Sequence, residues 1–118
     1  ANKIMGVYSA SFSPDAQRIV TASTDKTARL WEAASGKLLA TMKHDDVVSD
    51  ASFSSDGQRI VTASWDRTAR IWEAASGNLS VTMQHDDKVT HASFSPDSQR
   101  SSSQFQPTLP ASSMVTLP

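Results

Sequence analysis

The sequence contains no cysteine, which excludes disulfide bonds and thiolate metal ligands. It also lacks an excess of either charge, because 11 basic and 12 acidic residues leave a net charge of −1. Without a basic surface we expect neither nucleic acid nor a membrane as a partner. No apolar run approaches the roughly 20 residues of a spanning helix, and no signal-peptide pattern is present, so the cytoplasm is the expected location. The four glycines are isolated, which excludes a phosphate-cradling loop.

An internal repeat of 41 residues is the main feature that the sequence does have. Ser-Phe-Ser occurs at residues 11–13, 52–54 and 93–95, and Gln17–Ser23 returns as Gln58–Ser64. Residues 10–50 match residues 51–91 at 29 of 41 positions without a gap. Such a period indicates a repeat architecture, in which no single unit can bury its apolar faces alone.

Each repeat reads as four short strands with an apolar period of two. In the second repeat the strands are expected at residues 46–53, 59–64, 68–73 and 79–83, separated by turns at 55–58, 65–67 and 75–78. No segment has a sustained helical pattern. Four antiparallel strands in about 40–45 residues are typical of one blade of a β-propeller.

Several residues carry a resemblance to a known family. Trp31-Glu32 and Trp72-Glu73 end the third strand of each repeat, and His44 lies 28 positions before Trp72. The chain resembles the WD-repeat β-propeller family, particularly its regular bacterial members, with Glu for the usual Asp and with no Gly before His44 or His85. The resemblance covers residues 5–100. It implies an all-β fold of four-stranded antiparallel propeller blades, with blade 1 at 1–43, blade 2 at 44–84 and a partial blade 3 at 85–100.

The resemblance also implies a hydrogen-bond network in each blade between a His, a Ser or Thr, an Asp and a Trp. Matched position by position, its members are His44, Ser64, Asp66 and Trp72 in the second repeat, and Ser23, Asp25 and Trp31 in the first. Lys3 replaces the first histidine, and the third repeat has His85 but Phe105, Pro107 and Ser113 at the other places. Buried polar groups are costly unless they bond to one another, which favours a structural role.

A serine, a histidine and an aspartate also suggest a hydrolase, with Ser64, His44 and Asp66 as the triad. The set recurs in the repeat, however, and neither a strained elbow nor an oxyanion cradle accompanies it. His44-Asp45-Asp46 and His85-Asp86-Asp87 look like metal ligands, but adjacent residues rarely converge on one ion. We therefore predict no enzyme, no catalytic residue, no metal and no cofactor.

Positions that differ between repeats are free to serve a surface, and in the resembled family they line the top face, where proteins and peptides bind. The main differences are Gly6/Val47/Lys88, Tyr8/Ser49/Thr90, Ser9/Asp50/His91 and Thr24/Trp65. The candidate protein-binding residues are Trp65, Lys88, Tyr8, Asp50, Val47 and His91. An indole in a turn is a typical interface anchor, which makes Trp65 the strongest candidate. The alternatives are neutral variation and packing of Trp65 on a neighbouring blade.

The last 18 residues, 101–118, break the pattern. They carry five serines, three prolines and no charge, whereas residues 1–100 carry 23 charges. This composition is typical of a disordered tail or linker. A reading frame displaced by two nucleotides can instead spell a sequence close to residues 19–32. The hypothesis is therefore that the tail is the rest of blade 3 read out of frame, which the encoding DNA would test.

Two blades and a part cannot close a ring that needs about four to eight. We expect homo-oligomerisation to complete it, although a fragment of a longer chain and an aggregate are alternatives. The function predicted is a non-enzymatic protein-interaction scaffold that self-assembles into a propeller. The alternative is a purely structural propeller piece without a ligand, either engineered or derived from a larger bacterial signalling protein.

Overall fold

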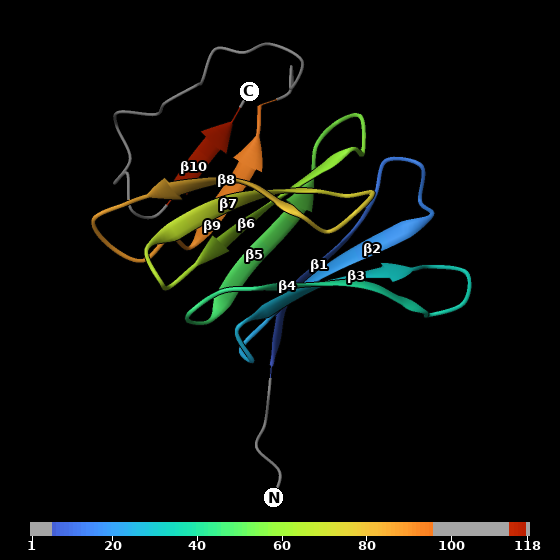
Figure 1. The fold of residues 1–118 in the computed structure, drawn as a ribbon, viewed down its shortest axis with the longest axis horizontal. Coiled ribbons are helices and arrows are strands. Elements are labelled where there is room, and N and C mark those ends of the chain that lie inside the picture. The colour runs from blue at the N-terminus through green and yellow to red at the C-terminus, as the bar shows by residue number, and fades with distance from the viewer. Residues whose placement is uncertain (1–5, 96–113, 118) are drawn as a thin grey trace, which may run out of the picture.

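The computed structural model describes residues 6–95 and the backbone of residues 114–117. Two four-stranded antiparallel sheets make up most of it (Figure 1). The strands are β1 (Val7–Phe12), β2 (Arg18–Ser23), β3 (Thr27–Glu32) and β4 (Leu38–Lys43) in blade 1, and β5 (Val48–Phe53), β6 (Arg59–Ser64), β7 (Thr68–Glu73) and β8 (Leu79–Gln84) in blade 2. The predicted all-β fold of four-stranded antiparallel blades is confirmed. The part of the chain described has no helix, and so none that is long and apolar enough to cross a membrane.

The two sheets have matching strands and the same break in strand pairing. The pairing register shifts between Val7 and Ser9 in blade 1 and between Val48 and Asp50 in blade 2. One extra residue in a strand increases its local twist, so both blades twist at the same place. Each blade also has a positive-φ residue in its first turn, Ala16 at 62° and Gly57 at 73°.

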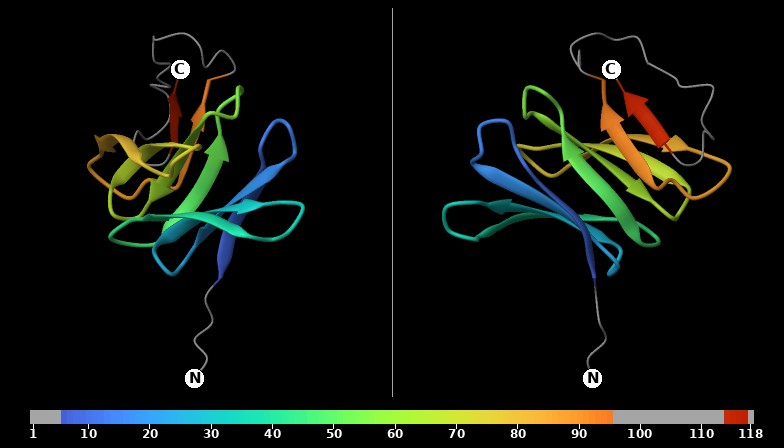
Figure 2. Two further views of the ribbon diagram at one scale, coloured as in Figure 1. Left: turned by 45° about the vertical axis from the view of Figure 1, so that its right-hand side comes forward. Right: turned by 180° about the vertical axis from the view of Figure 1, so that it is seen from behind.

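The main core lies between the two sheets, which pack face to face as Figure 2 shows. Its buried members are Val20, Ala22, Ala28, Leu30 and Met42 from blade 1 and Val48, Ala51, Ile60, Trp72 and Ala74 from blade 2. Arg18 joins the same blades, since its guanidinium donates to the carbonyls of Ala74 and Gly57 and lies over the ring of Phe53. Blade 2 thus covers one face of blade 1, and most of the residues between them are identical in the two repeats.

A second core forms where the third repeat begins. Val89 and Ala92 pack on Val61, Ala63 and Ile71 of blade 2, and β9 (His91–Phe94) continues from them. The backbone strand β10 (Met114–Leu117) pairs with β9 in parallel, whereas all strand pairs inside the two blades are antiparallel. Residues 96–113 and 118, which hold most of the expected tail, lie outside the described residues.

No other described element packs on one apolar surface of blade 1, and we refer to its residues Val7, Phe12, Ile19 and Trp31 as the open face. Their equivalents in blade 2 face blade 1 across the main core. Val7 is 62% exposed whereas Val48 is fully buried, and Phe12 is 60% exposed whereas Phe53 packs against the core. Ile19 and Trp31 are half-buried, whereas the equivalent Ile60 and Trp72 are buried. All four side chains are therefore more exposed in blade 1 than in blade 2.

Candidate functional site

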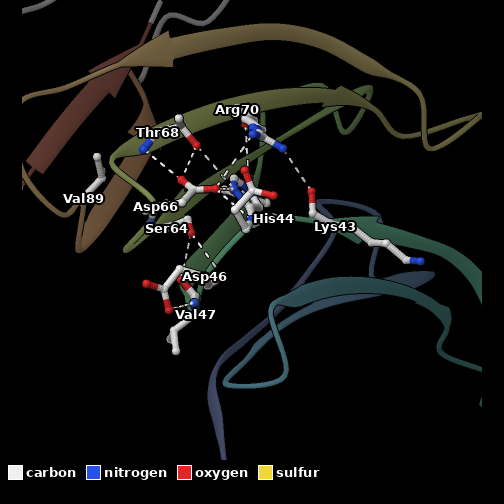
Figure 3. A network of polar contacts seen from close by, with 12 residues as sticks. Lys43, His44, Asp46, Val47, Ser64, Asp66, Thr68, Arg70 and Val89 are labelled. Atoms are coloured by element: carbon white, nitrogen blue, oxygen red, sulfur yellow. Dashed lines mark hydrogen bonds and ion pairs between the residues drawn. The ribbon is translucent and has the colours of Figure 1, made fainter.

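A buried chain of hydrogen bonds runs through blade 2 and starts at His44, in the loop between β4 and β5 (Figure 3). His44 Nδ1 lies 2.9 Å from Asp66 Oδ2, and His44 Nε2 lies 2.7 Å from Thr62 Oγ1. The indole N–H of Trp72 donates to the same Thr62 oxygen at 2.9 Å. One threonine hydroxyl therefore links the histidine on one side to the tryptophan on the other.

The protonation states in this chain follow from burial and from its hydrogen bonds. Burial lowers the pKa of His44 below its usual value, and the nearby Asp66 carboxylate opposes that effect only in part. Burial alone would raise the pKa of Asp66, but hydrogen bonds from Thr68, the Asp45 backbone N–H and His44 outweigh it and lower this pKa to about 2. A neutral His44 then donates from Nδ1 to an ionised Asp66 and accepts at Nε2 from the Thr62 hydroxyl.

Ser64 does not take the place in this chain that the sequence assigned to it. Its hydroxyl donates to the Val47 carbonyl at 2.9 Å and accepts from the Asp66 backbone N–H at 3.1 Å. The hydroxyl between His44 and Trp72 belongs to Thr62. Residues 62 and 64 point to the same side of β6, so the alternating pattern alone could not distinguish them. The buried Ser64 thus bonds to the 46–47 backbone and to Asp66, and it does not pair with His44 as a nucleophile with its base.

Sequence reasoning also missed two residues that hold Asp66 in place. The Thr68 backbone N–H donates to Asp66 Oδ1 at 2.9 Å, and the Thr68 hydroxyl bonds to the same oxygen. Arg70 lies 3.8 Å from Asp66 Oδ2 and donates to the Lys43 carbonyl at 3.1 Å. The repeat carried the signal for both, since Thr27 and Arg29 stand at the matching places and contact Asp25.

Blade 1 has the same arrangement without the histidine. The Trp31 indole donates to Thr21 Oγ1 at 3.0 Å, and Ser23 accepts from the Asp25 backbone N–H at 3.2 Å. Lys3, which stands in register with His44, lies outside the described residues. In the third repeat, His85 Nε2 is buried with no hydrogen-bond partner among the residues described. Of the three repeats, only the second therefore shows the full chain from Asp to Trp.

A second group of side chains lies on the surface and contains three of the residues predicted to bind a partner. The rings of Tyr8 and Trp65 are 6.0 Å apart between centroids and are tilted by 46°. The Lys88 ammonium lies 4.5 Å from the centroid of the Trp65 ring. These residues, which we refer to as the aromatic cluster, come from three successive repeats, and Tyr8 is 52% exposed. The structure thus brings together three positions at which the repeats differ.

The other predicted binding residues lie around the aromatic cluster in different roles. Asp50 accepts from the Ser9 hydroxyl at 3.2 Å and from the Ala92 backbone N–H at 3.3 Å, so it connects all three repeats. Val47 contributes its carbonyl to Trp65 and Ser64, and His91 is exposed on β9. The described residues contain no group of three or more His, Cys, Asp or Glu side chains that could hold a metal ion.

Comparison with known proteins identifies the repeat. The family described as "WD domain, G-beta repeat" matches residues 3–32 and 36–73, which together are more than half of the chain. The chain belongs to the WD40 family. Among curated WD40 relatives, WD repeat-containing protein 1 of Gallus gallus is 36% identical over 45 residues, which are 38% of this chain and 7% of that protein.

Solved structures show the same WD40 fold. The structures titled "Crystal structure of RRP9 WD40 repeats" and "Structure of U3-55K" each match with a TM-score of 0.70 and 24% identity. Each match covers 77% of this chain but only 30% of the other. The chain is thus similar to less than a third of those propellers. WD40 domains in general serve protein interaction.

Proposed function

We propose that this WD40 chain is a non-enzymatic protein-interaction scaffold that completes its propeller by association with further copies of itself. The observation that carries the proposal is the open face. Val7 and Phe12 are about three-fifths exposed there, whereas the equivalent Val48 of blade 2 is fully buried under blade 1. The surface that packs between blades in blade 2 thus has no blade on it in the described part of the single chain.

The energetics favour covering the open face. Full burial of a Val or Phe side chain stabilises by about 1.5–3 kcal/mol, and monomeric proteins rarely expose large contiguous apolar patches. The covering surface in this chain is the blade 1 face that carries Val20, Leu30 and Met42. Blade 2 repeats this face as Val61, Ile71 and Met83, and only the third repeat covers it, with Val81 still 43% exposed. Copies that associate head to tail would bring such a face to the open face.

The partner of the assembled scaffold is proposed to be a protein or peptide, bound at the surface that carries the aromatic cluster. The net charge of −1 supports leaving nucleic acid and membranes out of the proposal. The cytoplasm remains the expected location.

A purely structural propeller piece without a ligand is the second candidate. The observation that favours it is the state of the third repeat, in which His85 Nε2 is buried without a partner among the described residues and β10 pairs with β9 in parallel. If the chain is such a piece, the open face packs against another blade of a larger protein, and copies of this chain do not cover it.

The rate at which an introduced cysteine is alkylated distinguishes these candidates. Because the chain has no native cysteine, only the introduced thiol reacts. In Phe12→Cys the thiol should react quickly with an alkylating reagent at high dilution and slowly at high protein concentration, as copies cover the open face. Phe53→Cys gives the slow reference rate, since Phe53 packs against the main core.

Leu39→Cys is the matched control for an exposed apolar position. Leu39 is 43% exposed, and blade 2 has an exposed serine, Ser80, at the same place, so contact between blades does not depend on it. Its alkylation rate should not change with protein concentration. If Phe12→Cys reacts as fast as Leu39→Cys at every concentration, copies do not cover the open face and self-assembly is wrong.

A further inference from the structure

We propose that the aromatic cluster binds a cationic peptide segment, one with lysine or arginine side chains, and that Lys88 occupies the place of the ligand cation in the free protein. The inference deepens the proposed interaction function and rests on it, but it does not depend on self-association. It is carried by the geometry of three side chains and by the charges around them.

Trp65 already binds a cation in this structure. The Lys88 ammonium lies 4.5 Å from the centre of its ring, within the distance at which the electron-rich face of an indole attracts a positive charge. No carboxylate lies within ion-pair distance of Lys88 in the described residues. The Trp65 ring is therefore the main contact of this ammonium, and Tyr8 of blade 1 places a second ring beside Trp65.

Backbone hydrogen bonds place the turn of Trp65 between two acidic loops. The Trp65 N–H donates to the Val47 carbonyl at 2.9 Å, and the Val89 N–H donates to the Ser64 carbonyl at 3.0 Å. The loop at residues 44–47 carries Asp45 and Asp46, and the loop at residues 85–90 carries Asp86 and Asp87. Figure 3 shows Asp46 and Val47 next to Ser64 and Asp66 at this turn.

The charges of these loops favour a positive partner. None of Asp45, Asp46, Asp86 and Asp87 forms an ion pair with a basic side chain within the described parts of the chain. Arg67 and Lys88 lie in these segments, and Lys43 and Arg70 adjoin the first loop, where Arg70 already pairs with Asp66. The four loop carboxylates still outnumber the three remaining cations, Lys43, Arg67 and Lys88. An acidic peptide would be repelled by both loops, whereas a basic one would be attracted and would find aromatic rings at the centre.

Comparison of the two blades indicates that the aromatic cluster is not needed for folding. Blade 1 has Thr24 at the place of Trp65, and Thr24 makes the same backbone bond, to the Gly6 carbonyl at 2.9 Å. Blade 2 has Ser49 and Val47 at the places of Tyr8 and Lys88. A threonine, a serine and a valine are thus accepted by the same backbone. The three replacements Trp65→Thr, Tyr8→Ser and Lys88→Val therefore test binding without disturbing the blades.

The test measures the binding of a fluorescein-labelled peptide of alternating lysine and glycine by anisotropy, with an alternating glutamate and glycine peptide as the opposite charge. The lysine peptide should bind, and Trp65→Thr should weaken its binding by about 5–30-fold, the loss expected for one partly desolvated cation–π contact. Tyr8→Ser should weaken binding by a smaller factor. Lys88→Val should strengthen binding several-fold, because the internal competitor is removed.

The sign of the Lys88→Val effect decides between partners of opposite charge. If the glutamate peptide binds and Lys88→Val abolishes that binding, the partner is acidic and the inference is overturned. If the lysine peptide binds equally well to Trp65→Thr, the carboxylates attract it without the rings, which also overturns the inference. If neither peptide binds, the inference fails, while a concentration-dependent protection of Phe12→Cys would still support the scaffold.

Discussion

At the scale of single residues, Thr62 is the junction of the polar network. It accepts from the Trp72 indole and donates to His44 Nε2, and it is itself fully buried. A hydroxyl in this place satisfies two buried nitrogens at once. Ser64, two residues later, caps the turn and leaves the network to Thr62.

Replacing Thr62 by valine should destabilise the protein by about 2–4 kcal/mol. Valine keeps the shape of threonine but leaves His44 Nε2 and the Trp72 N–H without partners, and each buried unsatisfied group costs about 1–3 kcal/mol. Urea denaturation followed by tryptophan fluorescence measures the change. Thr21→Val is the matched control in blade 1, where Trp31 is only half-buried, and about 1 kcal/mol or less is expected there. Equal losses at both sites would contradict the role of Thr62.

Stability should fall in two steps on acidification. Burial lowers the pKa of folded His44 below the unfolded value of 6.5, so the unfolded state takes up this proton first and stability decreases as the pH falls below 6.5. The pKa of folded Asp66 is about 2 against 3.8 in the unfolded chain, so a second loss extends from pH 3.8 down to about 2. Urea denaturation across this range measures both steps.

Each step has its own control variant. His44→Gln should flatten the first step, and Asp66→Asn should reduce the second. Part of the second step should remain in Asp66→Asn, because hydrogen bonds also lower the pKa of Asp15, Asp25 and Asp56. A profile of His44→Gln that keeps the decrease below pH 6.5 would show that another group causes it.

Individual side-chain contacts could be predicted from the sequence only in part. The family resemblance implied His44, Asp66 and Trp72 as members of the network, and the structure places them in one chain of hydrogen bonds with Thr62. The assignment of Ser64 to the network was wrong, because Thr62 and Ser64 lie on one side of the same strand and only the structure shows that the Thr62 hydroxyl reaches the imidazole. Contacts such as Tyr8 with Trp65 join different repeats and have no pattern along the chain that predicts them.

At the scale of elements, the strands follow closely from the sequence. The strands expected at residues 59–64 and 68–73 have those bounds as β6 and β7. The strand expected from residue 46 begins at Val48, because residues 44–47 form the loop that carries His44. β-branched runs between turn residues set the interior of each strand, whereas the end of a strand depends on bonds to neighbouring loops.

Two matched glycines test how closely the blades approach. Gly36 and Gly77 both have φ of 77°, so alanine at either place should cost about 1 kcal/mol in backbone strain. A Cβ at Gly36 would meet nothing within 4 Å, but a Cβ at Gly77 would lie 2.8 Å from the Cβ of Ala40 in blade 1. Gly77→Ala should therefore destabilise by about 1–3 kcal/mol more than Gly36→Ala in thermal or urea denaturation.

The excess should disappear when the contact is relieved. Ala40→Gly in the Gly77→Ala background should bring the loss back toward that of Gly36→Ala. If both alanine variants lose the same stability, the two blades do not touch at Gly77.

At the scale of the whole molecule, the described residues form two complete blades and the start of a third repeat. Blade 2 covers one face of blade 1, and the other face of blade 1 is the open face. The pairing of β10 with β9 is parallel, whereas the second strand of a blade pairs antiparallel with the first, so residues 114–117 do not take that place in the third repeat. The sequence predicted an incomplete ring because the repeat stops at Arg100, but nothing in a periodic pattern determines what covers the last face. That depends on which surfaces of other molecules are available.

The native mass of the 118-residue chain, measured by light scattering coupled to size exclusion over a range of concentrations, tests the account most directly. We predict one discrete oligomer, a fixed multiple of 12.7 kDa, and dissociation to 12.7 kDa when Phe12→Asp places a charge on the open face. Leu39→Ser should keep the mass of the unmodified chain. A mass of 12.7 kDa for the unmodified chain at every concentration, or a polydisperse distribution, would contradict the account.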